Sequence, residues 1–112
     1  MGFGLVVVAR PASHPLGPVV ASGNDANKAG MASPGCAPAS ISVGAVYDAN
    51  VGAVGWSSCT DSTTGADLVT CFSNSASFLT LLAPGTCVAA GGIQMSGTSQ
   101  ATPHVAGAMA VL

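Results

Sequence analysis

Charge is scarce in this sequence. Only 5% of its 112 residues are Asp, Glu, Lys or Arg, whereas an ordinary soluble domain has roughly a quarter. The formal net charge of −2 provides no basic surface, which argues against nucleic acid and against an anionic membrane as a partner. Because 49% of the residues are apolar, we expect a chain that is buried within something larger or poorly soluble alone.

Long apolar runs are also missing. No run approaches the roughly 20 residues that cross a bilayer, so no membrane span is predicted. The N-terminal string "MGFGLVVVAR" lacks the cationic start of a signal peptide and has a short apolar run. The length allows one domain with a modest core.

The cysteines lack the close spacing of a zinc site. Cys36, Cys59, Cys71 and Cys87 form no Cys-x2-Cys pair. An even number of cysteines in a chain with so little charge favours disulfides formed in an oxidising compartment. Free thiols in the core are the alternative. Four cysteines allow three pairings, and the sequence does not choose among them.

The apolar pattern predicts strands at residues 5–9, 19–21, 41–46 and 78–82. Three prolines make residues 10–18 a loop, residues 48–67 resemble surface turns, and Gly91-Gly92 marks another turn. A helix is expected from Thr98 onward, with Pro103 in its first turn. Its end, "VAGAMAVL", has no polar side chain and no stop signal, which predicts a helix buried on all sides. We therefore expect the chain to be part of a longer domain.

Ser99 follows Gly97-Thr98 where this helix begins. There a serine hydroxyl lies at the positive end of the helix dipole, beside backbone N–H groups aimed at whatever the serine attacks. The simpler interpretation is that Thr98 or Ser99 only caps the helix.

The full string "GTSQATPHVAG", residues 97–107, closely resembles the nucleophile motif of the subtilases, the subtilisin-like serine proteases. That motif reads Gly-Thr-Ser-x-Ala-x-Pro-His-Val-Ala-Gly, and every fixed position matches. The resemblance implies that Ser99 is a catalytic nucleophile. "VVASGN", residues 19–24, resembles the segment with the family's oxyanion-hole asparagine, which implies that Asn24 and the Ser99 N–H bind the developing oxyanion.

"SISVGAV" and "FSNSASFLTLLAPG" match the family segments between these two motifs, so the resemblance covers about residues 18–112. By the same resemblance Ala21, Ser22 and Gly23 line the substrate pocket, with the loop at residues 32–35 as its other wall. Residues 1–17 depart from the pattern and form an atypical segment of undecided origin.

The other two members of the family's triad are not found. Neither an Asp-[Ser/Thr]-Gly nor a His-Gly-Thr motif occurs. His104 lies five residues after Ser99, about 500° around a helix, so it points away from the serine and is expected to be a packed helix residue. His14 lies in the proline loop and lacks the motif. Asp25, Asp48, Asp61 and Asp67 read as turn residues, with calcium binding as the alternative.

The resemblance implies the C-terminal part of an α/β, three-layer domain whose mostly parallel sheet lies between helices. The implied activity is serine endopeptidase hydrolysis of polypeptides, with no cofactor for the chemistry and no assignable calcium. The missing N-terminal part of the domain is the expected partner, and the chain alone is expected to be inactive. The parent protein is expected to be extracellular. The alternative is a non-catalytic peptide-binding or relic fragment.

Overall fold

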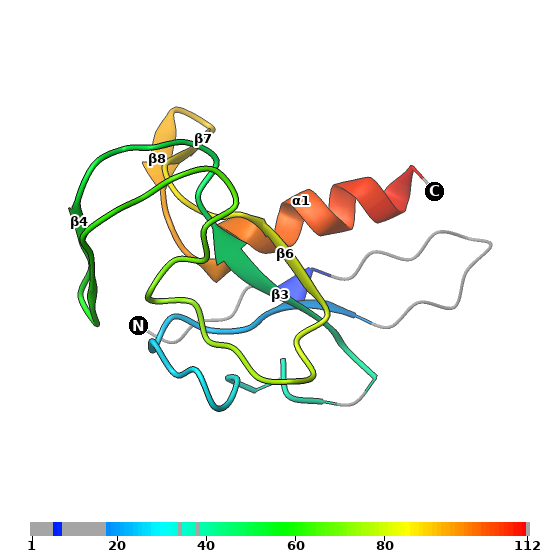
Figure 1. The fold of residues 1–112 in the computed structure, drawn as a ribbon. Coiled ribbons are helices and arrows are strands. Elements are labelled where there is room, and N and C mark those ends of the chain that lie inside the picture. The colour runs from blue at the N-terminus through cyan, green and yellow to red at the C-terminus, as the bar shows by residue number, and fades with distance from the viewer. Residues whose placement is uncertain (1–5, 8–17, 34, 38, 112) are drawn as a thin grey trace.

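The computed structural model describes residues 6–7, 18–33, 35–37 and 39–111. Within them one helix, α1, lies along a small sheet, and two short hairpins lie outside it (Figure 1). The elements are β1 (Val6–Val7), β2 (Val19–Ala21), β3 (Ile41–Val46), β4 (Val54–Gly55), β5 (Thr60–Asp61), β6 (Leu81–Pro84), β7 (Val88–Ala90), β8 (Ile93–Met95) and α1 (Thr98–Ala110).

The central sheet has the order β1-β2-β3-β6. Strands β2, β3 and β6 are parallel, and β1 is antiparallel to β2. Val19, Val20 and Val43 are fully buried, because β-branched side chains pack well on the faces of a parallel sheet. The predicted strands 19–21 and 41–46 are confirmed with the same bounds.

Helix α1 packs on this sheet through small side chains. Ala101, Val105 and Met109 join Val43 and Ala45 in one core cluster. The helix start comes especially close at Gly85, where a Cβ would lie 2.6 Å from the Cβ of Ala45 and 2.7 Å from the carbonyl oxygen of Gly97. This contact fixes the height of the helix N-terminus above the sheet. A parallel sheet with a C-terminal helix confirms the expected α/β class.

The last strand of the sheet lies later than predicted. Residues 78–82 were expected, but β6 spans Leu81–Pro84. Phe78 is 56% exposed, and the N–H of Leu79 closes a turn onto the carbonyl of Ala76. Proline is tolerated at the end of β6 because that strand is at the edge of the sheet. Of the predicted strand 5–9, Val6–Val7 form β1 and the rest lies outside the described residues.

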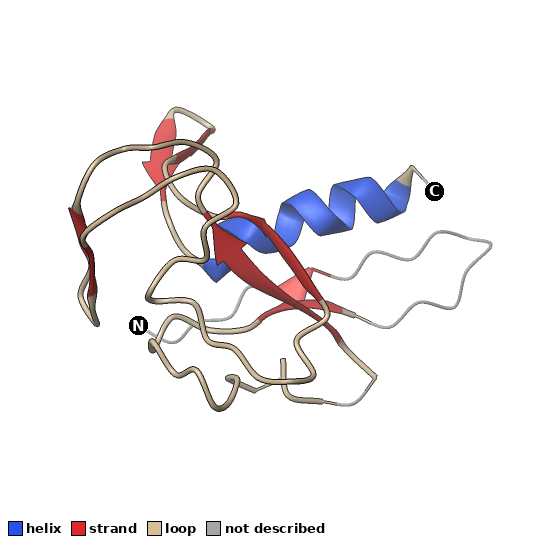
Figure 2. Ribbon diagram, in the orientation of Figure 1, coloured by secondary structure: helices blue, strands red, loops and turns tan. Residues whose placement is uncertain are grey.

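Two hairpins and long irregular segments surround the sheet (Figure 2). The expected turn at Gly91-Gly92 is confirmed. It joins β7 to β8 with φ values of 60° and 80°, which are the two left-handed positions of a tight hairpin turn. Hairpin β4–β5 lies in the segment that was predicted to contain only surface turns.

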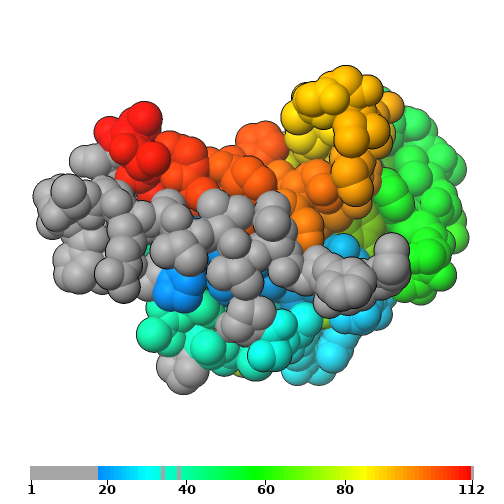
Figure 3. Space-filling view, turned by 180° about the vertical axis from the view of Figure 1, so that it is seen from behind, coloured from blue at the N-terminus to red at the C-terminus, as the bar shows by residue number. Residues whose placement is uncertain are grey.

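The predictions for the helix need two corrections. Pro103 is the sixth helical residue, not a first-turn residue. The helix is also not buried on all sides, because Gly107, Ala108, Ala110 and Val111 are exposed, Val111 by 85%. In the described residues the sheet covers only the inner face of α1, and the last turn stands at the surface (Figure 3).

Candidate active site

Thr98 joins the helix start to the turn that carries Asn24, 74 residues earlier. The backbone N–H and the hydroxyl of Thr98 both donate to Oδ1 of Asn24, each at 2.8 Å. The Thr98 hydroxyl also accepts the N–H of Gly23 at 3.1 Å, and Thr98 is completely buried. The two motifs that the sequence singled out therefore lie side by side.

These bonds orient the Asn24 amide. Two donors require an acceptor, so Oδ1 is the atom that faces Thr98. The donor Nδ2 is left beside Gly97, 3.1 Å from where a Cβ on that glycine would lie. An oriented amide donor next to a helix N-terminus is the arrangement that stabilises a developing oxyanion.

Ser99 lies in the first turn of α1 and is half-buried. The N-cap is Gly97, with no side-chain cap hydrogen bond, so the interpretation that Thr98 or Ser99 caps the helix is wrong. Gly97 has a φ of 154°, and a Cβ there would lie 2.9 Å from Oε1 of Gln100, which explains why glycine precedes Thr98.

Ser99 also lines a cavity of about 350 Å³. The other residues around it are Val88, Ala90, Gln100, Pro103 and His104.

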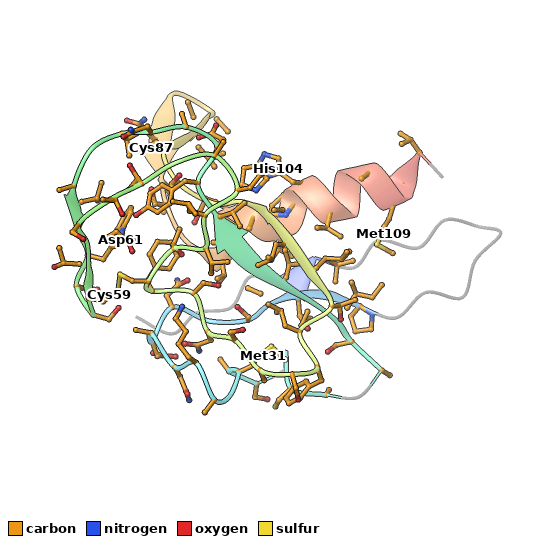
Figure 4. All side chains as sticks on the ribbon, in the orientation of Figure 1. Met31, Cys59, Asp61, Cys87, His104 and Met109 are labelled. Atoms are coloured by element: carbon orange, nitrogen blue, oxygen red, sulfur yellow. A yellow bond between two sulfur atoms is a disulfide. The ribbon has the colours of Figure 1, made fainter. Side chains whose placement is uncertain are left out.

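His104 is exposed, which contradicts the predicted packed position. Its Nδ1 lies 3.0 Å from the carbonyl oxygen of Gln100, one helical turn earlier. His104 and the buried Met109 leave α1 on opposite sides (Figure 4). The reason is the uncovered outer face of the helix described above. His14 lies outside the described residues.

Asn74 supports the Asn24 turn and was not assigned a role from sequence. Its Oδ1 accepts the N–H groups of Asp25 and Asn27 at 2.9 and 3.0 Å, and its Nδ2 donates to the Asp25 carboxylate at 3.0 Å. Its own N–H donates to the carbonyl of Gly23 at 2.8 Å. Asn74 is 2% exposed. The signal in the sequence was the string "FSN", which matched the family pattern without indicating this role.

Lys28 ties the same loop to the residues before Asn74. Its Nζ donates to the carbonyl oxygens of Ser73 at 2.6 Å and Thr70 at 3.1 Å. Partial burial lowers the pKa of Lys28, and the negative charge of Asp61 opposes that shift. The ammonium group therefore joins the two loops through carbonyl groups.

Asp61 is the centre of a second network. Its Oδ2 accepts the hydroxyl of Tyr47 at 2.6 Å, the N–H of Cys71 at 3.0 Å and Nε1 of Trp56 at 3.3 Å. No motif in the sequence distinguishes Asp61 from the other three aspartates. The Cys59–Cys71 disulfide closes the same segment, which confirms the expectation of a disulfide. Cys36 and Cys87 are free and exposed, so the alternative of free thiols in the core is wrong for these two.

We expect Tyr47 to lose its proton at a higher pH than an ordinary tyrosine. Burial raises the pKa of Tyr47 from 10.0 to about 12, and its hydrogen bond to Asp61 adds to the shift. Since the folded-state value is the higher one, the neutral phenol stabilises the fold fully below pH 10, and this contribution is lost as the pH rises toward 12. Tyr47 is the single tyrosine, so absorbance at 295 nm measures it directly. A midpoint at the ordinary value for tyrosine would contradict the buried network.

Thr98→Val tests the link between the two motifs. Valine keeps the shape of threonine but leaves the buried N–H of Gly23 without its acceptor. The free energy of unfolding is expected to fall by about 2 kcal/mol, measured by urea unfolding followed through the fluorescence of the single tryptophan. Thr98→Ser, which keeps the hydroxyl, is the control and should cost less than half as much. Equal losses for the two variants would assign the effect to packing.

The predicted pocket residues Ala21, Ser22 and Gly23 are all buried. The loop expected as the opposite wall packs directly on them, because the N–H of Ala32 donates to the carbonyl of Ser22 at 2.8 Å and Gly35 lies against the carbonyl of Ala21. Their role as pocket walls stays a prediction.

Within the described ranges, no three His, Cys, Asp or Glu side chains gather in a way that could hold a metal ion. In the same part of the chain, no helix is long and apolar enough to span a membrane.

Comparison with known proteins gives one family. The profile described as the subtilase family matches residues 12–112. A subtilisin-like protease of Coccidioides posadasii is 41% identical over 101 residues, which cover 84% of this chain. The chain spans 21% of the length of that relative. No solved structure matched the chain. With the nucleophile motif and the Asn24 turn held together as described, and with this match over most of its length, the chain belongs to the subtilase family.

Proposed function

We propose that this chain carries the nucleophile and the oxyanion-binding groups of a serine endopeptidase that cleaves polypeptides. The supporting observation is the set of hydrogen bonds from Thr98 to Asn24, which holds the start of the Ser99 helix against an oriented amide. Ser99 attacks the scissile carbonyl, and Nδ2 of Asn24 with the N–H of Ser99 stabilises the negative oxygen that forms. This chemistry needs no cofactor.

The general base and the carboxylate that orients it come from another segment. Of the two histidines, neither lies in the family's His-Gly-Thr motif, and His104 is bonded to the carbonyl of Gln100. The N-terminal part of the catalytic domain is the partner that supplies both groups. Without them Ser99 is a poor nucleophile, so the 112-residue chain is inactive by itself. The Cys59–Cys71 disulfide supports an extracellular location for the parent protein.

The second candidate is a peptide-binding segment with no catalytic role. The observation that favours it is the lack of a triad histidine motif in the sequence. The two candidates differ in what the chain does when a base is supplied.

A chimera distinguishes them. Residues 18–112 replace the aligned segment of the Coccidioides posadasii protease, and hydrolysis of a denatured protein is measured together with the thermal melting of the chimera. We expect a folded chimera that hydrolyses protein, while the 112-residue chain does not. A chimera that melts cooperatively but hydrolyses nothing would favour the peptide-binding function. If the chimera does not fold, mixing the chain with the remainder of the relative and assaying recovered hydrolysis gives the same decision.

A further inference from the structure

A small cavity lies beside Asn24, separate from the hollow that Ser99 lines. Its volume is about 130 Å³, and its lining residues are Asn24, Trp56, Ser57, Phe72, Ser96 and Gly97. None of these side chains carries a charge. Because Asn24 and Gly97 belong to the candidate active site, a group in this cavity would lie next to the bond being cleaved.

Two aromatic rings form the apolar walls. The ring centroids of Trp56 and Phe72 are 4.8 Å apart and their planes meet at 76°, an edge-to-face contact. Phe72 is 4% exposed and belongs to the core cluster, and Trp56 is partly buried against that cluster. One wall is therefore fixed by the core, and the other is held by an outlying loop.

Trp56 is held in place by three kinds of contact. Its Nε1 donates to the hydroxyl of Tyr47 at 3.0 Å and to Asp61 at 3.3 Å. Its backbone N–H donates to the carbonyl of Cys59 at 2.8 Å, and the Cys59–Cys71 disulfide joins this loop to the residue before Phe72. Cys59 and Asp61 lie together on the loop that projects from the sheet (Figure 4).

The loop that carries Trp56 also contacts the Asn24 turn. The hydroxyl of Ser58 donates to the backbone carbonyl of Asn24 at 3.3 Å. Trp56 is thus positioned relative to Asn24 by a short chain of contacts, so the shape of the cavity depends on the loop.

We propose that this cavity accepts an uncharged apolar side chain of the polypeptide substrate and that Trp56 determines the specificity. Asp61 and the Cys59–Cys71 disulfide act as positioning groups that hold Trp56. The proposal rests on the proposed endopeptidase function. The volume of about 130 Å³ is enough for a side chain about the size of leucine, which would rest on the two rings, while Asn24, Ser57 and Ser96 make the remaining lining polar. A charged side chain would lose its hydration against two aromatic walls.

Binding can be measured without catalysis, because Trp56 is the single tryptophan. The 112-residue chain is titrated with N-acetyl-leucine amide and, separately, with N-acetyl-glutamate amide. We expect a saturable fluorescence change with the leucine probe only. The matched control is the Cys59→Ser/Cys71→Ser double variant, which keeps Trp56 but releases its loop and should bind the leucine probe at least tenfold more weakly. Equal responses to both probes, or no response to either, would overturn the proposal.

Cleavage profiling of the chimera gives the second measurement. Trp56→Ala should lower the preference for leucine over glutamate beside the scissile bond by about tenfold in kcat/KM, whereas Trp56→Phe should keep most of it. Leu68→Ala is the control, because Leu68 is 49% exposed and does not line the cavity. If the chimera is active but its preference for leucine over glutamate is unchanged by Trp56→Ala, the specificity role is refuted and the endopeptidase function is not. Leucine binding without any hydrolysis supports the cavity and refutes the endopeptidase function.

Discussion

Replacing Ser99 by alanine in the chimeric protease is expected to lower turnover by about 10⁶-fold. The magnitude is the known loss when subtilisin, another member of the family, loses its nucleophile, and the physical reason carries over. The serine, its base and the orienting carboxylate act as a unit, so removal of one member removes nearly the whole contribution of all three. In the proposed mechanism, the Asn24 amide and the helix N-terminus would retain only the small residual effect of an oxyanion site.

We expect the Ser99→Ala substitution to affect turnover and KM differently. In the proposed mechanism, the hydroxyl of Ser99 reacts in the transition state and contributes little to substrate binding, so KM should change little while turnover collapses. Ser77→Ala is the matched control, since Ser77 is exposed on a loop outside the site, and it should retain activity. Measurable hydrolysis by Ser99→Ala within a hundredfold of the parent chimera would show that another residue is the nucleophile.

Replacing Asn74 by alanine is expected to lower the free energy of unfolding of the chain by about 3 kcal/mol. Three hydrogen bonds of the buried amide are lost, one of them to a carboxylate. The N–H groups of Asp25 and Asn27 lose their acceptor, and a cavity is left behind. Because Asp25 and Asn27 lie one and three residues after Asn24, the loss falls on the turn that carries the proposed oxyanion donor.

Asn50→Ala is the control for this prediction. Asn50 is an exposed turn residue whose Oδ1 accepts the N–H of Gly52 at 2.9 Å, so its replacement should cost well under half as much. Urea unfolding measures both variants. In the chimera, Asn74→Ala should also reduce turnover, because a loosened Asn24 no longer meets the oxyanion in one geometry. Equal stability of the two variants would show that Asn74 does not support the turn.

The parts of the fold predictable from sequence were those encoded by local pattern. Val19–Ala21 and Ile41–Val46 are short, β-branched runs bounded by turn residues, and both strands have the predicted bounds. The helix start at Thr98 was also predicted from the local pattern of the sequence. The bounds of β6 were misplaced because Phe78 is apolar but lies on a turn with its ring exposed. Hydrophobicity alone does not distinguish a buried strand residue from an exposed turn residue.

The burial of α1 depends on tertiary contacts rather than on local sequence. An all-apolar helix was predicted to be covered on every side, yet Ala108, Ala110 and Val111 are exposed in this chain. Sequence pattern reports which residues are suited to burial. It does not report which elements are present to cover them.

The candidate site was predictable where a motif named the residue. Ser99 and Asn24 came from such motifs, and the structure brings the segments that carry them together. Asn74, Asp61 and Trp56 were missed because their roles depend on hydrogen bonds between distant segments, such as the bond from Asn74 to Asp25, 49 residues away. Asp61 was predicted to be a turn residue, but the structure places it in β5, and an isolated aspartate in a Ser/Thr-rich segment gives no sign that three donors converge on it.

The assignment of Ser99 as nucleophile is tested most directly by labelling the chimera with a fluorophosphonate and locating the adduct by mass spectrometry of the digested protein. We predict one adduct, on the peptide that contains Ser99, formed rapidly in the chimera and absent from both Ser99→Ala and the 112-residue chain alone. An adduct on any other residue, or a folded and unlabelled chimera, would contradict that assignment.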